Sequence, residues 1–228
     1  MIRFKWIIIR TSAKFDDLAN MLIENSFIAN STSGFLVNLV NNDYIEGDFV
    51  QRTINKEKII RPDTTEDIIE IERFNYLRFN ISYVKESYYL ISLINPPRKI
   101  FDFLNYINFH LGTRIIVIPV ELDVMDVIGF IRSDKKTKSL SIKKIKVSAI
   151  ELSVRSSASI EIQSHDNAHE EFMKNFSFDK FIVDNVKALA IYDGRKINLS
   201  IKKTGVSSEG IDITFIIKEI ICKGNLDV

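Results

Sequence analysis

Two histidines lie four residues apart in the segment His165-Asp-Asn-Ala-His169. Histidines at this spacing on one helix can ligate a shared metal ion. The order is not that of a zinc protease, in which glutamate follows the first histidine, and Asp166 suits the N-cap of a helix better than its interior. Capping at Asp166 would leave His165 outside the helix. The sequence therefore predicts no metal site and no cofactor. His165 and His169 are only weak candidates for metal ligands.

A second group of residues that could bind a metal or act in catalysis is acidic. It consists of Asp63, Glu66, Asp67, Glu70 and Glu72. Pro62-Asp63 followed by Glu70-Ile-Glu72 is similar to the PD-(D/E)xK pattern of metal-dependent nucleases, but position 72 is glutamate where that pattern requires lysine. Carboxylates hold magnesium only when they converge in space. We interpret the run as a charged loop followed by the solvent face of a strand, and keep a metal-dependent hydrolase or nuclease as one alternative function.

The third group is basic and falls within fifteen residues. Its members are Arg132, Lys135, Lys136, Lys138, Lys143, Lys144 and Lys146. On one edge of a sheet these side chains would follow a nucleic-acid backbone by charge alone, with salt-sensitive affinity. Lysines also keep solvated strand edges from aggregating, and no aromatic residue is interleaved for base stacking. A nucleic-acid-binding module using this 132–146 edge is the other alternative function.

Other catalytic signatures are missing from the sequence. Cys222 has no histidine near it, and no serine stands in a Gly-x-Ser-x-Gly elbow. The segment Gly205-Val-Ser-Ser-Glu-Gly210 joins two expected strands, whereas a phosphate-binding loop leads into a helix. The sequence thus favours a chain that is not an enzyme.

Composition indicates an ordinary globular protein. The 228 residues are 46% hydrophobic and 27% charged, with a net charge of +1, so bulk charge does not predict a nucleic-acid partner. A single cysteine excludes an intramolecular disulfide and favours a reducing compartment. The apolar run near the N-terminus is too short for a signal peptide, and no stretch reaches the roughly 20 apolar residues that span a bilayer. We expect a cytoplasmic protein without membrane association.

The segment Leu90 to Val120 predicts a strand, a helix and a strand. Pro96-Pro97 ends the first strand, because proline cannot donate to a sheet. An apolar stripe then recurs at helical spacing, formed by Ile100, Phe103, Leu104, Ile107 and Leu111. Gly112 suits the position after the helix, and Ile115 to Ile118 is apolar enough for a strand buried on both faces.

The rest of the first half alternates between strands and one helix. Strands are expected at 3–10, 35–40, 44–53 and 68–81, a helix at 13–25, and a polar loop at 55–63.

In the second half, a short helix is expected around Val124 to Ile131, and residues 139–163 alternate as one strand or two, with a bulge near Ala149. Asp166 or Asn167 caps a helix that runs to Phe176 and points Phe172, Met173 and Phe176 inward. A hairpin turns at Asp193-Gly194, and a loop at 204–210 precedes a last strand at 211–218.

Several aromatic residues have amphipathic character or fall outside the main helical stripe. They are Tyr83, Tyr88, Tyr89, Phe101, Tyr106 and Phe109. Core packing and a protein interface both explain such residues. We keep the six as candidate interface residues.

These patterns together predict an α+β fold with mixed, mostly antiparallel sheets, about ten strands, about four helices and a central βαβ unit. A division into 1–121 and 122–228 is expected, although one continuous domain is nearly as consistent with the sequence. The leading function is a non-catalytic interaction or adaptor subunit of a prokaryotic or phage multi-protein complex. Its partner would be a protein, and nucleic acid stays open as a second partner.

Overall fold

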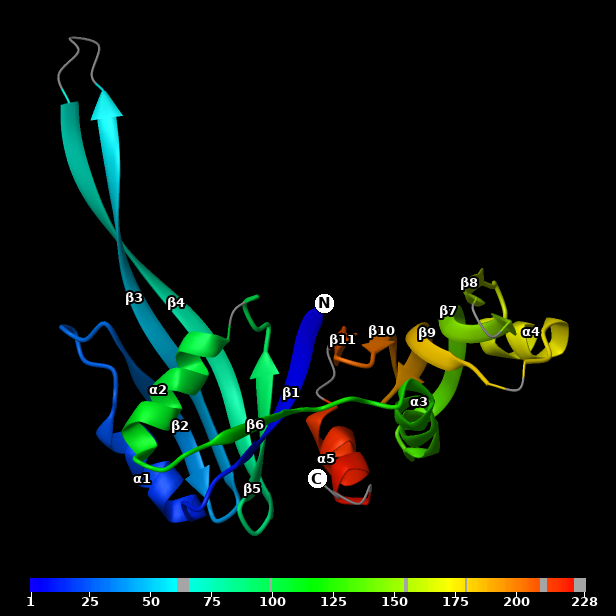
Figure 1. Ribbon diagram of the computed structural model, residues 1–228, viewed down its shortest axis with the longest axis horizontal. Helices are drawn as coiled ribbons and strands as arrows, with labels where there is room; N and C mark the ends of the chain where they lie inside the picture. Colours follow the sequence, from blue (N-terminus) through cyan, green and yellow to red (C-terminus); the bar gives the residue numbers. More distant parts are fainter. Residues whose placement is uncertain (61–65, 99, 154–155, 179, 210–212, 224–228) are drawn as a thin grey trace. The chain divides into compact units, whose positions relative to one another are not determined.

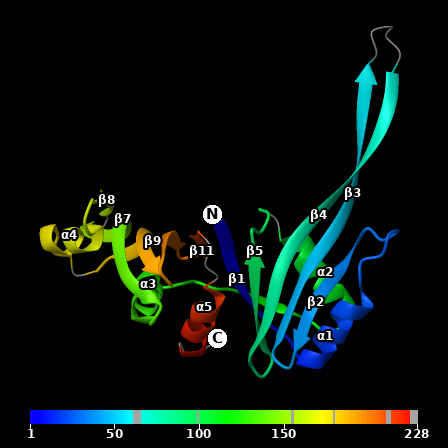
Figure 2. The same cartoon turned by 180° about the vertical axis from the view of Figure 1, so that it is seen from behind.

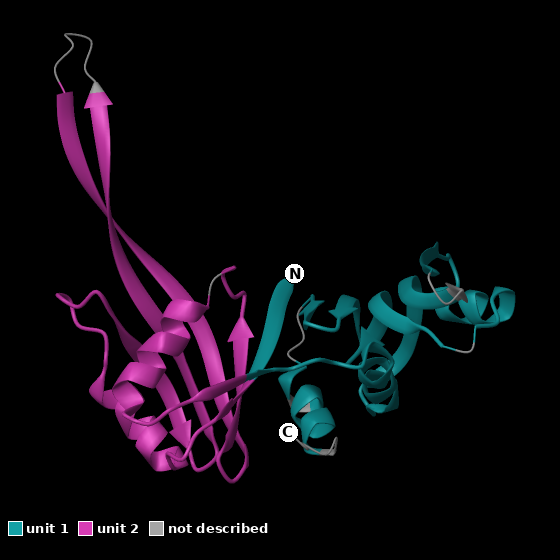
Figure 3. Cartoon of the chain, viewed as in Figure 1, with its two compact units in different colours: residues 1–7, 118–228 teal, residues 8–117 magenta. Residues whose placement is uncertain are grey.

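The computed structural model describes residues 1–60, 66–98, 100–153, 156–178, 180–209 and 213–223. The chain forms two compact units: unit 1 is Met1–Ile7 with Ile118–Val228, and unit 2 is Ile8–Val117 (Figure 3). Both are built mainly of antiparallel strands with helices, so the predicted mixed, mostly antiparallel fold is confirmed. The described residues contain eleven strands and five helices, one more of each than expected.

Unit 2 contains four strands in the antiparallel order β2-β3-β4-β5. These are β2 (Ser33–Asn41), β3 (Tyr44–Ile60), β4 (Glu66–Lys85) and β5 (Tyr88–Ile94), with helices α1 (Phe15–Glu24) and α2 (Phe101–Leu111). Both helices lie on the same face of the sheet (Figures 1 and 2). The strands β1 (Ile2–Arg10) and β6 (Ile116–Pro119) divide between the units, and β6 pairs with β1.

An aromatic cluster forms the core between α2 and this sheet. Phe103 on the predicted apolar stripe packs against Phe35, Phe49 and Phe79, with ring centroids 5.2–6.4 Å apart. The helix ends at Gly112 with φ 68°, as its sequence predicts. The return strand differs from expectation, because Ile116 and Val117 are exposed and β6 lies beside β1 rather than β5. The strand, helix and strand are present, but the central unit differs in detail from the prediction because β5 and β6 each neighbour β1.

The strands β3 and β4 continue far beyond the rest of their sheet (Figures 1 and 2). Pairing of β2 with β3 ends at Gln51, and pairing of β5 with β4 ends at Arg78. Residues 52–60 and 66–74, here called the arm, are paired in the described ladder only with each other. At about 3.4 Å per residue, nine residues give the arm a length of about 30 Å. The polar loop predicted at 55–63 is wrong as far as residue 60, and its remainder lies outside the described residues.

Unit 1 has the antiparallel order β1-β11-β10-β9-β7-β8. Its further elements are α3 (Val124–Ser133), β7 (Thr137–Ser153), β8 (Ser156–Gln163), α4 (Ala168–Asn175), β9 (Ile182–Tyr192), β10 (Arg195–Lys202), β11 (Gly205–Ser208) and α5 (Thr214–Lys223). Helix α3 packs against α5 and against β7, β9 and β10, and Val127, Ile131 and Ile217 of the two helices are buried. One face of the sheet carries the exposed side chains of Lys187 and Lys202, together with Ile191.

Three local features predicted for unit 1 are confirmed: a bulge, a hairpin turn and a helix cap. Ala149 has φ 53°, and the β7–β8 register shifts between Val147 and Ile150, which is the predicted bulge. Asp193 and Gly194 have φ 48° and 75°, as a two-residue hairpin turn requires. Asn167 caps α4 by accepting a hydrogen bond from the His169 amide.

Three other predictions in unit 1 are wrong. The expected loop at 204–210 contains β11, and the expected last strand gives way to helix α5. Ile213, Ile217 and Ile221 are buried. They are four residues apart, which fits one face of a helix, and all are odd-numbered, which also fits one face of a strand. Met173 is 52% exposed rather than inward, whereas Phe172 is buried.

Candidate functional site

Cross-strand ion pairs cover one face of the arm. Lys56 Nζ lies 2.8 Å from Glu70 Oε1, and Lys58 Nζ lies 2.6 Å from Glu66 Oε2. Arg52 forms a third pair with Glu72. The hydrogen bond between Lys56 and Glu70, together with their charges, raises the pKa of Lys56 and lowers the pKa of Glu70. These contacts hold the two strands in register where no third strand supports them.

Large apolar side chains lie exposed between the ion pairs. Their exposed fractions range from 43% to 69%, and they are Ile54, Ile59, Ile68, Ile69 and Phe74 on the arm, with Tyr76 at its base. They project from both faces, because even- and odd-numbered positions of a strand point in opposite directions. A two-stranded ribbon has no interior in which to bury them. The arm therefore offers apolar surface for contact with another molecule.

A cavity of about 670 Å³ lies at the base of the arm, and we call it the base pocket. The buried side chains of Phe49, Leu77 and Phe103 line it, together with exposed Phe74 and Tyr76. Polar groups complete its lining, among them Gln51, Asn75, Asn95 and Asp102. Gln51 Nε2 donates to Asp102 Oδ2 at 3.4 Å. An apolar lining with a few polar groups suits the anchor side chain of a protein partner.

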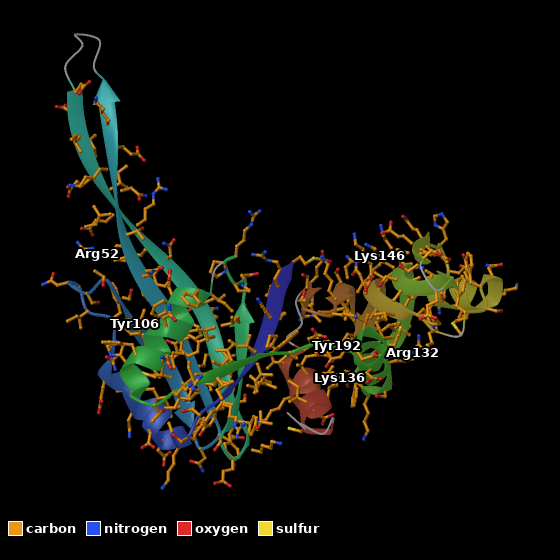
Figure 4. The ribbon with its side chains drawn as sticks, viewed as in Figure 1. Arg52, Tyr106, Arg132, Lys136, Lys146 and Tyr192 are labelled. Atoms are coloured by element: carbon orange, nitrogen blue, oxygen red, sulfur yellow. The ribbon has the colours of Figure 1, made fainter. Side chains whose placement is uncertain are left out.

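The six predicted interface aromatics have different environments. Phe101 and Phe109 on α2 are 68% and 80% exposed, and Phe101 precedes Asp102 of the base pocket. Tyr106 is half-buried on Phe35 and Phe49, and its hydroxyl donates to the Ser33 carbonyl at 3.1 Å (Figure 4).

The three tyrosines near β5 also differ. Tyr89 is a core residue whose hydroxyl donates to the Ala13 carbonyl at 2.7 Å. Tyr83 is 39% exposed, whereas Tyr88 lies beneath the charged groups of Arg10 and Lys85. Of the six, only Phe101 and Phe109 present most of their surface to solvent.

The predicted basic group does not come together at a strand edge. From Lys144 to Val147, β7 pairs with β8 on one side and β9 on the other, so this part is not a sheet edge, whereas residues 137–143 have a described ladder with β9 alone. Arg132 lies in the last turn of α3 and Lys136 in the turn that follows, whereas Lys146 lies on the other side of the strands (Figure 4). Lys135 belongs to the turn after α3, and Lys138 is exposed near the start of β7.

Two members of the basic group have specific partners. Lys143 Nζ donates to the carbonyls of His165 and Asp166, the second at 3.2 Å. Lys144 Nζ lies 2.6 Å from Glu161 Oε1. Sequence reasoning missed the cations that share a sheet face with Lys144 and Lys146, because Arg3, Lys187 and Lys202 belong to other strands.

The two histidines lie on either side of the N-cap of α4. His165 precedes the Asn167 cap and lies outside α4, whereas His169 lies inside it. Burial and the charge of Arg132 lower the pKa of His169. In the part of the chain that the structure describes, no three His, Cys, Asp or Glu side chains are grouped to hold a metal ion. The acidic candidates Glu66, Glu70 and Glu72 instead face basic side chains of β3.

Comparison with known proteins gives no family for this chain. No protein-family model matches it, and no curated protein matches it significantly. Across the described residues, no helix is long and apolar enough to cross a membrane. The arm and the base pocket are the features of this chain that bear most directly on its function.

Proposed function

We propose that this chain is a non-catalytic interaction subunit that binds another protein through its arm and base pocket. The observation that supports the proposal is the arm. It is a two-stranded ribbon about 30 Å long, its strands are joined by ion pairs, and it carries exposed isoleucines. The two strands of the arm form no hydrophobic core of their own, so the arm does not bury these isoleucines. Contact with a partner would bury this apolar surface.

The charges of the arm favour a protein partner over nucleic acid. Its described residues carry four basic side chains and five acidic ones, so it has no excess of positive charge. The ion pairs engage most of these groups within the arm itself. Each half-exposed isoleucine that a partner covers would contribute about 1 kcal/mol to binding. A few such contacts, with an anchor in the base pocket, suffice for a specific complex.

The setting that we propose is a multi-protein assembly of a prokaryotic or phage host, in which the chain acts as an adaptor. The hydrolase alternative finds less support, because Glu70 and Glu72 pair with Lys56 and Arg52 rather than converging on each other. Changing Glu70 or Glu72 to alanine would therefore alter the arm and not an active site.

The test compares two double variants in a pull-down of the tagged full chain from its own host. Ile54→Ser with Ile68→Ser removes apolar surface from the arm. Ile182→Ser with Ile191→Ser removes comparable exposed surface from unit 1 and serves as the matched control. We expect one stoichiometric protein partner, resistant to nuclease, that the arm variant loses and the control retains. Retention by the arm variant, or equal loss by both, would refute the proposal.

A further inference from the structure

The polar face of the sheet in unit 1 gathers basic and hydroxyl side chains from five strands. We propose that this face binds the phosphate backbone of a nucleic acid, independently of base sequence. It is a different surface from the predicted 132–146 edge and is independent of the arm. It includes only Lys144 and Lys146 from the predicted basic group, and adds residues that strand pairing brings beside them.

Strand register defines a first row of side chains across this face. Arg3 on β1 pairs with Ser207, and Ser207 pairs with Ser200. Ser200 in turn pairs with Lys187, and Lys187 with Lys144. Directly paired residues place their side chains on the same face, with neighbouring strands about 4.8 Å apart. The row therefore spans about 19 Å and presents a guanidinium, two hydroxyls and two ammonium groups.

A second row runs parallel to the first, two residues further along the strands. Lys202 pairs with Asn185, and Asn185 pairs with Lys146. A hollow of about 730 Å³ lies on this face, and its lining includes Lys144, Lys187 and Lys202. Two rows of donors about 7 Å apart can contact several phosphates of one strand at once.

The balance of charge on this face stays positive. Lys144 and Lys187 are direct cross-strand partners, and like charges in this position repel each other. Two carboxylates, Glu161 and Glu209, also line the hollow. A hydrogen bond from Lys144, with the charges of Lys146 and Lys187, lowers the pKa of Glu161. Glu209 accepts a hydrogen bond from the Asn198 amide, so the two carboxylates do not offset the cations of both rows. A bound phosphate would relieve the repulsion that remains.

The types of side chain on these rows select the backbone rather than the bases. Lysine, arginine, serine and asparagine are the usual donors to phosphate oxygens. Neither row contains an aromatic residue on which a base could stack. Because the net charge of the chain is only +1, binding would depend on this face and not on the protein as a whole.

The experiment measures fluorescence anisotropy of a labelled 30-nucleotide single strand with the full chain, over a range of sodium chloride concentrations. With four of the five cations in the two rows engaged, the logarithm of the binding constant should fall with the logarithm of salt at a slope of about −3. Lys187→Glu with Lys202→Glu should weaken binding at least about tenfold and reduce the slope by about 1 to 2. The matched control, Lys135→Glu with Lys136→Glu, makes the same charge change beside α3 and should bind within about twofold of the parent.

A gain-of-affinity variant separates loss of binding from loss of folding. Glu161→Gln removes the carboxylate among the lysines and should tighten binding about two- to fivefold. Misfolding cannot produce that result. The proposal is overturned if both charge-reversal variants lose affinity equally, if Glu161→Gln weakens binding, or if the parent does not bind at low salt. Equal affinity for a poly-glutamate peptide would also overturn it, because the face would then be a general anion surface.

Discussion

Lys56 and Glu70 are direct cross-strand partners on the arm, and their side chains meet at 2.8 Å. Both groups are exposed to solvent, so salt and competing water weaken their attraction. The contact therefore adds little to the stability of unit 2 as a whole. Its importance is local, because it selects one pairing of two strands that have no third strand to guide them.

This contact predicts that the Glu70 carboxyl titrates at a lower pH than a free glutamate. Because the folded pKa of Glu70 is lowered, its contribution is present above the ordinary glutamate pKa and is lost as pH falls through the lowered value. Because the pKa of Lys56 is raised, its contribution disappears only as pH rises through that value. We expect carboxyl NMR to give Glu70 a midpoint below that of a free glutamate. Lys56→Met should return the midpoint to the ordinary range; an unchanged midpoint would show that the pair does not form in solution.

The two faces of α2 should respond very differently to truncation. Phe103 is buried in the aromatic cluster, and Phe103→Ala should lower the free energy of unfolding by about 3–5 kcal/mol. Phe109 on the same helix is 80% exposed, and Phe109→Ala should change it by no more than about 0.5 kcal/mol. Urea unfolding of both variants measures the difference. Similar losses for the two would mean that α2 packs on another face.

The Tyr89 hydroxyl provides a test of the α1–β5 packing. Tyr89→Phe removes its hydrogen bond to the Ala13 carbonyl and should cost about 1–2 kcal/mol. Tyr83→Phe is the control, since Tyr83 is 39% exposed. Burial raises the pKa of Tyr89, so its contribution is complete below the ordinary tyrosine pKa and is lost as pH rises through the folded value. Thermal melts of the two variants at neutral and alkaline pH would distinguish them. Equal stability would contradict the buried hydrogen bond.

The bulge residue Ala149 has the positive φ that favours glycine. Ala149→Gly should therefore raise the free energy of unfolding by about 0.5–1 kcal/mol, despite the greater freedom of glycine in the unfolded chain. Ala158 on β8 lacks a positive φ, so Ala158→Gly makes the same chemical change without that benefit and should lower stability. Chemical denaturation of the pair checks the sign, and a loss of stability in both would place Ala149 outside the left-handed region.

The features that sequence predicted correctly depend on neighbours within a few residues. The stripe of Phe103 and Ile107, the stop at Gly112 and the turn at Asp193-Gly194 are all of this kind. The C-terminal helix was missed because Ile213 and Ile217 satisfy an alternating pattern and a helical one equally. Only packing of α5 against α3 distinguishes these two possibilities.

The candidate sites were harder to predict because they depend on pairing between distant segments. Glu70 was correctly placed on a strand, but Lys56 was assigned to a polar loop, so the pairing of the two residues was not foreseen. Lys187 lies more than forty residues after Lys144 in the sequence, and only the β7–β9 register makes them neighbours. The predicted interface set did include Phe101, next to the base pocket, because exposed aromatics off the main stripe of a helix carry a local signal.

The division of the chain also has a consequence for its synthesis. Unit 2 is a continuous run, whereas unit 1 needs Ile2 to Phe4 of β1 to meet β11, roughly 200 residues later. A chain emerging from the ribosome can therefore complete unit 2 before Ile2 to Phe4 of β1 meet their β11 partner. Any fusion or truncation that removes β11 would leave the start of β1 without that pairing, although the unit translated next to it is intact.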